Sequence, residues 1–143
     1  KVAQLLLGYD LQVHAAHLNV DPIKGVDIHG GIFLTDGAGV VVETAFGFDN
    51  FYQCVLEIWG SKGKITADRI FTAGPGVAPK IKLEQQGVAD VIEPGADNHF
   101  LNLINDFAAT LSAGDCSAKY AEILSQARLL QEVADKAHNI LLQ

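Results

Sequence analysis

The sequence predicts an α+β fold, a mostly antiparallel open sheet with C-terminal helices packed on one face. As far as residue 93, apolar and polar side chains alternate with period two in short runs. Turn dipeptides such as Asp36-Gly37 separate these runs and favour hairpins. After Pro94-Gly95 the apolar period changes to 3.6. Strands followed by helices, with hairpin-length connections, are typical of antiparallel α+β domains.

The part of the chain before Pro94 divides into one helix end and a series of strands. Residues 1–8 resemble the last turns of a helix that stops at Gly8. Turns are expected at residues 36–37, 49–50 and 60–63, where Gly, Asp and Asn cluster. Strands are expected at residues 11–20, 26–35, 40–48, 51–59, 64–67, 80–86 and 89–93.

Two helices follow. The first carries one apolar stripe, has Asp97 or Asn98 as its N-cap and ends at Gly114. The second begins at Ser117 and continues past Ala137, with His138 near its C-terminal end. The stripe of the first helix consists of Phe100, Leu103, Ile104, Phe107 and Leu111.

The strands at 40–48 and 51–59 keep apolar side chains on both of their faces. Phe46, Phe48, Val55 and Trp59 would all be exposed if only one face of the sheet were covered. A sheet that is apolar on both faces is usually covered on the second by another domain or subunit. The pattern therefore predicts a homodimer through the open sheet face.

Composition limits the class of protein. The 143 residues suit a single domain, and a net charge of −7 argues against nucleic acid or an anionic membrane as partner. No apolar run reaches 18 residues, and Cys54 and Cys116 form no disulfide framework, so we expect a cytoplasmic protein. Because no methionine occurs, we expect a segment of a longer protein.

No catalytic, cofactor or metal motif stands out. The run Gly60-Ser-Lys-Gly-Lys64 lacks the first glycine and the final Ser or Thr of a phosphate loop, and no G-x-G-x-x-G follows a strand. His14 and His17 would point to opposite faces of a strand, and His14 and His29 could meet across two strands, without a third ligand. We therefore expect no catalytic residue, no bound cofactor and no metal site.

Two segments could contact a ligand. Asn98 and His99 lie at a predicted helix N-terminus, where free amides favour anions, and Arg69 with Phe71 precedes a Gly-Pro-rich loop. A structural interpretation stays open for both segments: a helix cap beside an exposed histidine in the first, and a salt bridge in the second.

The hairpin Glu57-Ile-Trp-Gly-Ser-Lys-Gly-Lys-Ile65 resembles the C-terminal domain of the Gfo/Idh/MocA oxidoreductases. Residues 69–72, 79–84 and 97–100 are similar, in that order, to the NDP-sugar 3-ketoreductase branch. The resemblance covers essentially the whole chain, 1–143.

The resemblance implies a substrate-binding and oligomerisation domain of an oxidoreductase that acts on a nucleotide-linked keto sugar. In that family an N-terminal Rossmann domain, absent from this sequence, holds NAD or NADP and supplies the catalytic lysine. The fragment itself is then not catalytically competent, and Arg69, Phe71, Asn98 and His99 are the expected substrate contacts. The alternative is a stand-alone dimerising interaction module without enzymatic activity.

Overall fold

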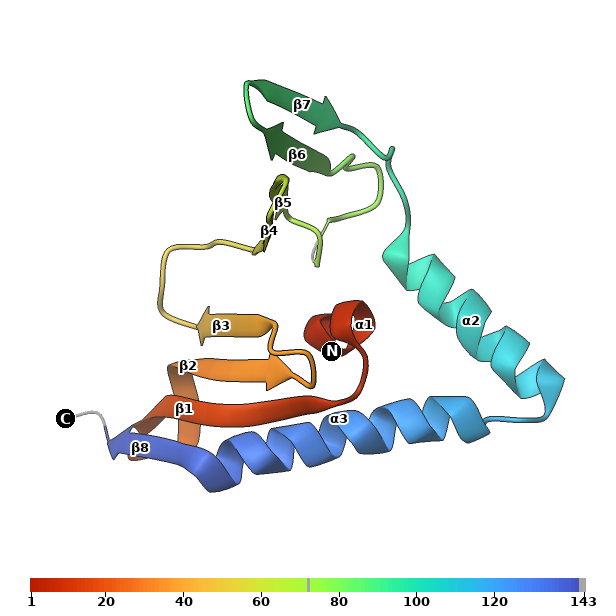
Figure 1. Ribbon diagram of the computed structural model, residues 1–143. Coiled ribbons are helices and arrows are strands. Elements are labelled where there is room, and N and C mark those ends of the chain that lie inside the picture. Colours follow the sequence, from red (N-terminus) through yellow and green to blue (C-terminus); the bar gives the residue numbers. More distant parts are fainter. Residues whose placement is uncertain (72, 142–143) are drawn as a thin grey trace. The chain divides into compact units, whose positions relative to one another are not determined.

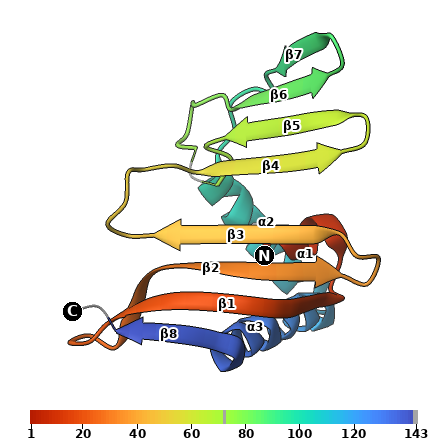
Figure 2. The same cartoon turned by 60° about the vertical axis from the view of Figure 1, so that its left-hand side comes forward.

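The computed structural model describes residues 1–71 and 73–141 and has the expected α+β class. Thr72, part of one segment that carries the family resemblance, lies outside the described residues. The strands form two sheets of four, with orders β3-β2-β1-β8 and β4-β5-β6-β7, where a single open sheet was expected (Figure 2). The chain divides into two compact units, Lys1–Asn50 with Cys116–Gln143, and Phe51–Asp115.

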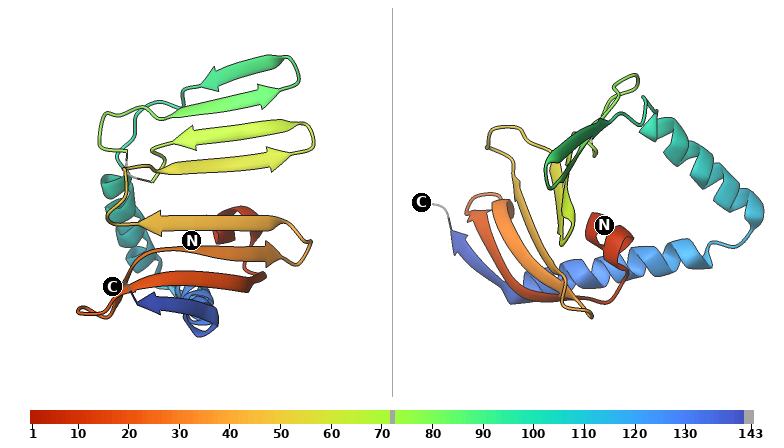
Figure 3. Two further views of the ribbon diagram at one scale, coloured as in Figure 1. Left: turned by 90° about the vertical axis from the view of Figure 1, so that its left-hand side faces the viewer. Right: turned by 45° about the horizontal axis from the view of Figure 1, so that its top comes forward.

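The first unit holds the first sheet and two helices. Strands β1 (Leu11–Asp21), β2 (Val26–Asp36) and β3 (Val41–Gly47) form an antiparallel meander, and β8 (Ala137–Leu141) pairs with β1 in parallel. Helix α1 (Val2–Leu7) ends at Gly8 as predicted, and α3 (Ser117–Lys136) runs along β1 (Figures 1 and 3).

The core of this unit lies between α3 and one face of the first sheet. We call this the inner face, and the opposite one the outer face. The side chains of the inner face alternate along β2 and β3 as the sequence predicts, because period-two alternation puts apolar residues on one side. The buried cluster consists of Val13, Ala16, Leu34 and Val133, with Ile32, Val42, Leu129 and Ala137 packed against it.

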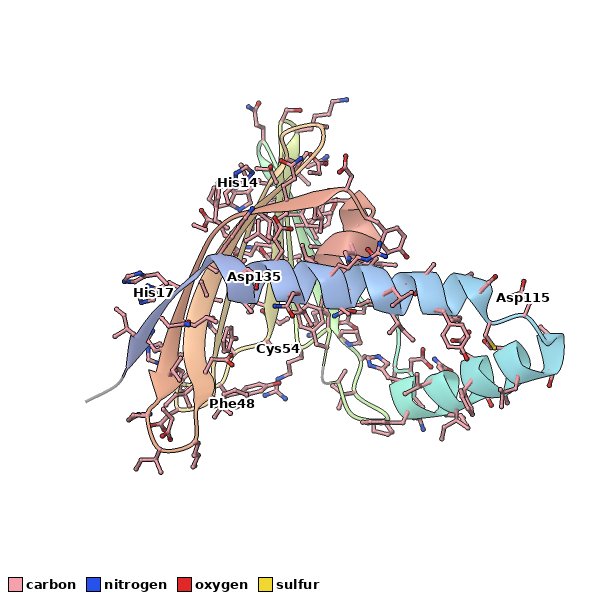
Figure 4. All side chains as sticks on the ribbon, turned by 90° about the horizontal axis from the view of Figure 1, so that it is seen from below. His14, His17, Phe48, Cys54, Asp115 and Asp135 are labelled. Carbon is pink, nitrogen blue, oxygen red and sulfur yellow. The ribbon has the colours of Figure 1, made fainter. Side chains whose placement is uncertain are left out.

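A β-bulge at His14 corrects the prediction that His14 and His17 point to opposite faces. Val13 pairs with Leu34 and Ala15 with Phe33, so one extra residue stands between them. As a result, Val13 and Ala16 both reach the inner face, and His14 and His17 both project from the outer face (Figure 4). The Lys136 ammonium donates to the Val13 carbonyl at 2.6 Å and supports the bulge.

Two further expectations about histidines are wrong. His29 pairs with Asn19, whereas the His14 ring lies 2.7 Å from the Thr35 hydroxyl, so His14 and His29 do not meet. His138 belongs to strand β8, not to the last helix, which ends at Lys136. The helical stripe continues in the sequence, but the free edge of β1 offers backbone hydrogen bonds that draw residues 137–141 into the sheet.

The second unit holds the second sheet and α2. Strands β4 (Val55–Gly60), β5 (Gly63–Asp68), β6 (Lys80–Gln85) and β7 (Val88–Ile92) are joined as consecutive antiparallel neighbours. Helix α2 (His99–Ala113) has Asn98 as its N-cap and ends at Gly114, whose φ of 72° is left-handed, as predicted. No residue of α2 is buried.

The expected hairpin at Asp49-Asn50 is wrong, because β3 and β4 belong to different sheets. Residues 51–54 are also outside any strand, although their side chains alternate. The ladder of β5 ends at Asp68, since Arg69 takes a left-handed φ of 55°. Residues before Val55 therefore lack a strand to pair with, and alternation alone does not make a strand. None of the helices in the described ranges combines the length and hydropathy needed to cross a bilayer.

Candidate functional site

Arg69 is held at the end of β5 by its backbone and by an aromatic ring. Its amide donates to the Cys54 carbonyl at 2.7 Å, which closes the mouth of the β4–β5 hairpin. The guanidinium carbon lies 5.8 Å from the centroid of the Tyr52 ring, within the range of a cation–π interaction. The side chain remains exposed. Arg69 thus presents a positioned cation to solvent, as an anion-binding residue would.

Phe71 follows two residues later. Its side chain is 48% exposed, whereas Ala73 in the same loop is buried. The Val77 amide donates to the Gly74 carbonyl at 3.1 Å and makes a turn within the loop. An aromatic side chain with half of its surface in solvent can stack on a planar ligand group.

Asn98 and Asp97 organise the start of α2. The Asn98 Oδ1 accepts from the Leu101 amide at 3.0 Å, and Asp97 accepts from the Asn98 amide and the Asn102 side chain, both at 2.7 Å. The structure therefore shows Asn98 as the N-cap of α2. The Asn98 Nδ2 has no protein partner among the described residues.

His99 is the first residue of α2, and its side chain is exposed. Within the described part of the chain, no hydrogen bond, ion pair or ring contact joins the Arg69–Phe71 segment to Asn98 or His99. The structure thus gives two local arrangements within the second unit. Their combination into one substrate site stays a prediction.

The turn at Gly60-Ser-Lys-Gly63 does not suit a nucleotide phosphate. Gly60 pairs directly with Gly63 across a tight hairpin, and strand β5 follows where a phosphate loop requires a helix. A Cβ at Gly63 would lie 2.4 Å from the Glu84 carbonyl oxygen, so this glycine is needed for close strand packing. We therefore assign no cofactor contact to this turn.

Ion pairs surround this hairpin. Lys64 and Glu57 pair at 2.7 Å, and the hydrogen bond that Lys64 donates to the Glu57 carboxylate raises the pKa of Lys64. Lys82 and Glu84 pair at 2.8 Å, and the hydrogen bond from Lys82 lowers the pKa of Glu84. Among the described residues, no group of three or more His, Cys, Asp or Glu side chains is placed to hold a metal ion.

The sequence does not indicate two residues that contact the predicted site residues Arg69 and Asn98. The alternation at 51–59 places Tyr52 in a strand, yet its ring supports the guanidinium of Arg69. The sequence offers Asp97 only as an alternative cap, yet it ties Asn98 to Asn102. The D-N-x-x-x-N spacing at 97–102 is a usable signal, because residues near a helix start reach back to its first turn.

Sequence comparison identifies relatives with a known activity. A dTDP-3,4-didehydro-2,6-dideoxy-alpha-D-glucose 3-reductase from Streptomyces antibioticus is 30% identical over 135 residues, which span 93% of this chain and 41% of that protein. The enzyme of the same name from Streptomyces violaceoruber is 32% identical over 96% of this chain and 43% of its own length. The chain thus spans less than half the length of these relatives.

Solved structures agree. KijD10, a 3-ketoreductase from Actinomadura kijaniata solved with NADP and TDP-benzene, superposes with a TM-score of 0.93 at 29% identity, over 99% of this chain and 44% of that one. A D-galactose-1-dehydrogenase protein from Rhizobium etli has the same fold, with a TM-score of 0.56 at 14% identity. No protein-family model matches the chain. The resemblance to the NDP-sugar 3-ketoreductases is confirmed.

Proposed function

Since this chain is homologous to part of the NDP-sugar 3-ketoreductases in the Gfo/Idh/MocA family, we propose that it is the substrate-binding and oligomerisation domain of such an enzyme. Residues 1–143 act as one domain of a longer cytoplasmic oxidoreductase, and a Rossmann domain outside this sequence holds NADP. The reaction is hydride transfer between the nicotinamide and a keto group of a nucleotide-linked sugar. The fragment alone is inactive, because neither the cofactor nor the proton-transfer groups belong to it.

One observation carries this proposal: the identity to dTDP-sugar 3-reductases extends over more than nine tenths of the chain. Similarity confined to the 57–65 hairpin would support only a shared local motif. The choice of NADP over NAD is supported by the NADP in the KijD10 structures. The choice of a nucleotide-linked substrate is supported by the names of the relatives and by the TDP-benzene in KijD10.

The four proposed contacts have chemistry that suits a nucleoside diphosphate sugar. Arg69 is an exposed cation stacked on Tyr52 and is available to a diphosphate oxygen. Phe71 offers half of an aromatic surface to a base or sugar ring. The Asn98 Nδ2 and the His99 ring add hydrogen-bond donors beside the positive end of α2. These side chains bind and orient the substrate, and none of them carries the hydride or the proton.

For oligomerisation we propose the outer face of the first sheet. Helix α3 covers the inner face, whereas Ala15, His17 and Glu43 on the outer face are exposed. The residues from which the sequence predicts a dimer are divided between the two units. Phe46 lies on the inner side with Val42, and Val55 and Trp59 belong to the second unit.

The test is an NMR titration of the 143-residue chain with dTDP and, separately, with NADPH. We expect dTDP to shift the amide signals of Arg69, Phe71, Asn98 and His99, and NADPH to shift none at the same concentration. Shifts with NADPH around the 60–63 turn would contradict the proposal that the Rossmann domain, and not residues 1–143, binds the cofactor. Shifts with dTDP confined to other residues would overturn the four contacts but leave the domain assignment.

The exposed apolar stripe of α2 favours a second candidate, a stand-alone dimerising interaction module. Its five large side chains are 57–69% exposed, and they would suit a helix-binding partner. If the chain is such a module, dTDP should shift no amide signal at any concentration. The enzyme domain predicts specific shifts, so one titration separates the two.

A further inference from the structure

The backbone at Arg69 is held in an unfavourable conformation. Within residues 1–71 and 73–141, Arg69 is the one non-glycine residue whose φ is left-handed, at 55°. Strain of this kind persists where the surrounding structure imposes it, and it concentrates at functional sites. The ladder between β4 and β5 ends at Val55 and Asp68, and the Arg69 amide then donates to the Cys54 carbonyl at 2.7 Å. This hydrogen bond fixes the point from which the Arg69 side chain starts.

The side chain of Arg69 reaches back to the ring of Tyr52. Its guanidinium carbon lies 5.8 Å from the ring centroid. Arg69 is exposed and Tyr52 is 57% exposed, so close packing holds neither side chain in place. In the part of the chain that the structure describes, the contact with the Tyr52 ring is therefore what restricts the rotamers of Arg69.

The ring holds this cation without neutralising it. Lys64, Lys80 and Lys82 of the second sheet each form an ion pair with a glutamate, whereas no carboxylate of the described residues pairs with Arg69. A carboxylate would occupy N–H donors of the guanidinium and cancel its charge. An aromatic ring attracts the cation through its π face and leaves those donors available. Arg69 is thus fixed in place and still able to bind an anion.

We infer that Tyr52 is a positioning residue, which holds the Arg69 guanidinium ready for the diphosphate of a nucleotide-linked substrate. The inference rests on the proposed function and names the part of the substrate that Arg69 contacts, the diphosphate and not the base or the sugar. A guanidinium offers paired N–H donors that match two phosphate oxygens. An arginine that a ring already holds loses less rotamer entropy on binding, so the Kd is lower. Tyr52 itself contacts no part of the substrate.

The experiment is an NMR titration of the 143-residue chain with dTDP, followed at the Nε–Hε signal of Arg69. Tyr52→Leu removes the ring, and we expect the Kd for dTDP to rise about threefold to tenfold. Before any ligand is added, the Arg69 signal should also lose the chemical shift that the ring causes. Tyr52→Phe keeps the ring without the hydroxyl, and it should keep the Kd within about twofold of the original.

Two further variants separate positioning from direct contact. Phe51→Leu is the matched control, because it removes a neighbouring ring that is 96% exposed and makes no cation–π contact with Arg69; both readouts should stay unchanged. Arg69→Met removes the cation and keeps the length of the side chain. In that background Tyr52→Leu should change the Kd by less than about twofold, since a positioning residue acts only through Arg69. The amide signals of β5 check that each variant is folded.

Each other outcome contradicts the inference in a distinguishable way. A chain that does not bind dTDP overturns the four substrate contacts and this inference with them. If dTDP binds and Tyr52→Leu leaves the Kd unchanged, the substrate contacts stand and the role of Tyr52 is wrong. An equal loss of affinity with and without Arg69 would mean that Tyr52 contacts the ligand directly.

Two smaller ligands test the assignment to the diphosphate. Inorganic diphosphate should shift the Nε–Hε signal of Arg69, because it carries the group that the guanidinium is inferred to bind. Thymidine, which has no phosphate, should leave this signal in place. A shift with thymidine and none with inorganic diphosphate would contradict the assignment.

Discussion

Replacing Asn98 with alanine separates the capping role of this residue from its proposed ligand role. The substitution removes the 3.0 Å hydrogen bond from the Leu101 amide to the Asn98 side chain. Loss of an N-cap costs about 1 kcal/mol, which is about a fivefold change in the equilibrium between helix and coil. No residue of α2 is buried, so packing does not compensate, and the loss should appear as local fraying.

The assay is the ¹³Cα secondary chemical shift across residues 99–113. We expect Asn98→Ala to reduce the helical shifts in the first turns of α2 and to leave those of β1 and β2 unchanged. Asn98→Asp is the control: aspartate caps as well as asparagine, and its charge suits the positive helix end. It should keep the helix but weaken dTDP binding through repulsion. Unchanged helical shifts in Asn98→Ala would refute the capping energetics, and full dTDP affinity in Asn98→Asp would refute the contact.

Three further predictions concern the core, Arg69 and one turn. Leu34→Ala, at a side chain that is 4% exposed, should lower the free energy of unfolding by about 2–5 kcal/mol in urea denaturation, and a smaller loss would mean that the first unit has a looser core. Arg69→Gly relieves a left-handed φ of 55°, so the free energy of unfolding should stay the same or rise by about 1 kcal/mol. Binding of dTDP should weaken, because the cation is lost. A lower free energy of unfolding would show that the contact with the Tyr52 ring outweighs the strain. The amides of Lys24 and Ile23 donate to the Asp21 carboxylate and lower its pKa below the ordinary 3.8. These hydrogen bonds therefore stabilise the folded chain above that pH, and the stabilisation is lost as the pH falls through the lowered pKa. Asp21→Asn should therefore flatten this part of the acid-unfolding curve, and a curve identical to that of the original chain would contradict the assignment.

Local chemistry allowed most of the elements to be predicted from the sequence. The stop of α1 at Gly8, the hairpin at Gly60–Gly63 and the start of α2 at Asn98 depend on residues within a few positions of each other. At Gly30 the neighbouring strand comes so close that a Cβ would lie 2.5 Å from the His17 carbonyl oxygen.

The failures are contacts between residues that are distant in sequence. The bulge at His14 exists because Val13 and Ala16 both find places in a core with Leu34, and a single added residue reverses every expected side-chain direction after it. Strand β8 forms because β1, more than a hundred residues earlier in the chain, has an open edge. The stacking of the His17 and His138 rings depends on both features, so no pattern in the sequence indicates it.

The coding DNA upstream of Lys1 tests the central claim most directly. If this chain is the substrate-binding part of an NADP-dependent reductase, the upstream DNA encodes, in frame, a strand–helix segment with G-x-G-x-x-G. A stop codon in place of that segment would contradict the enzyme assignment and leave a module that binds another protein.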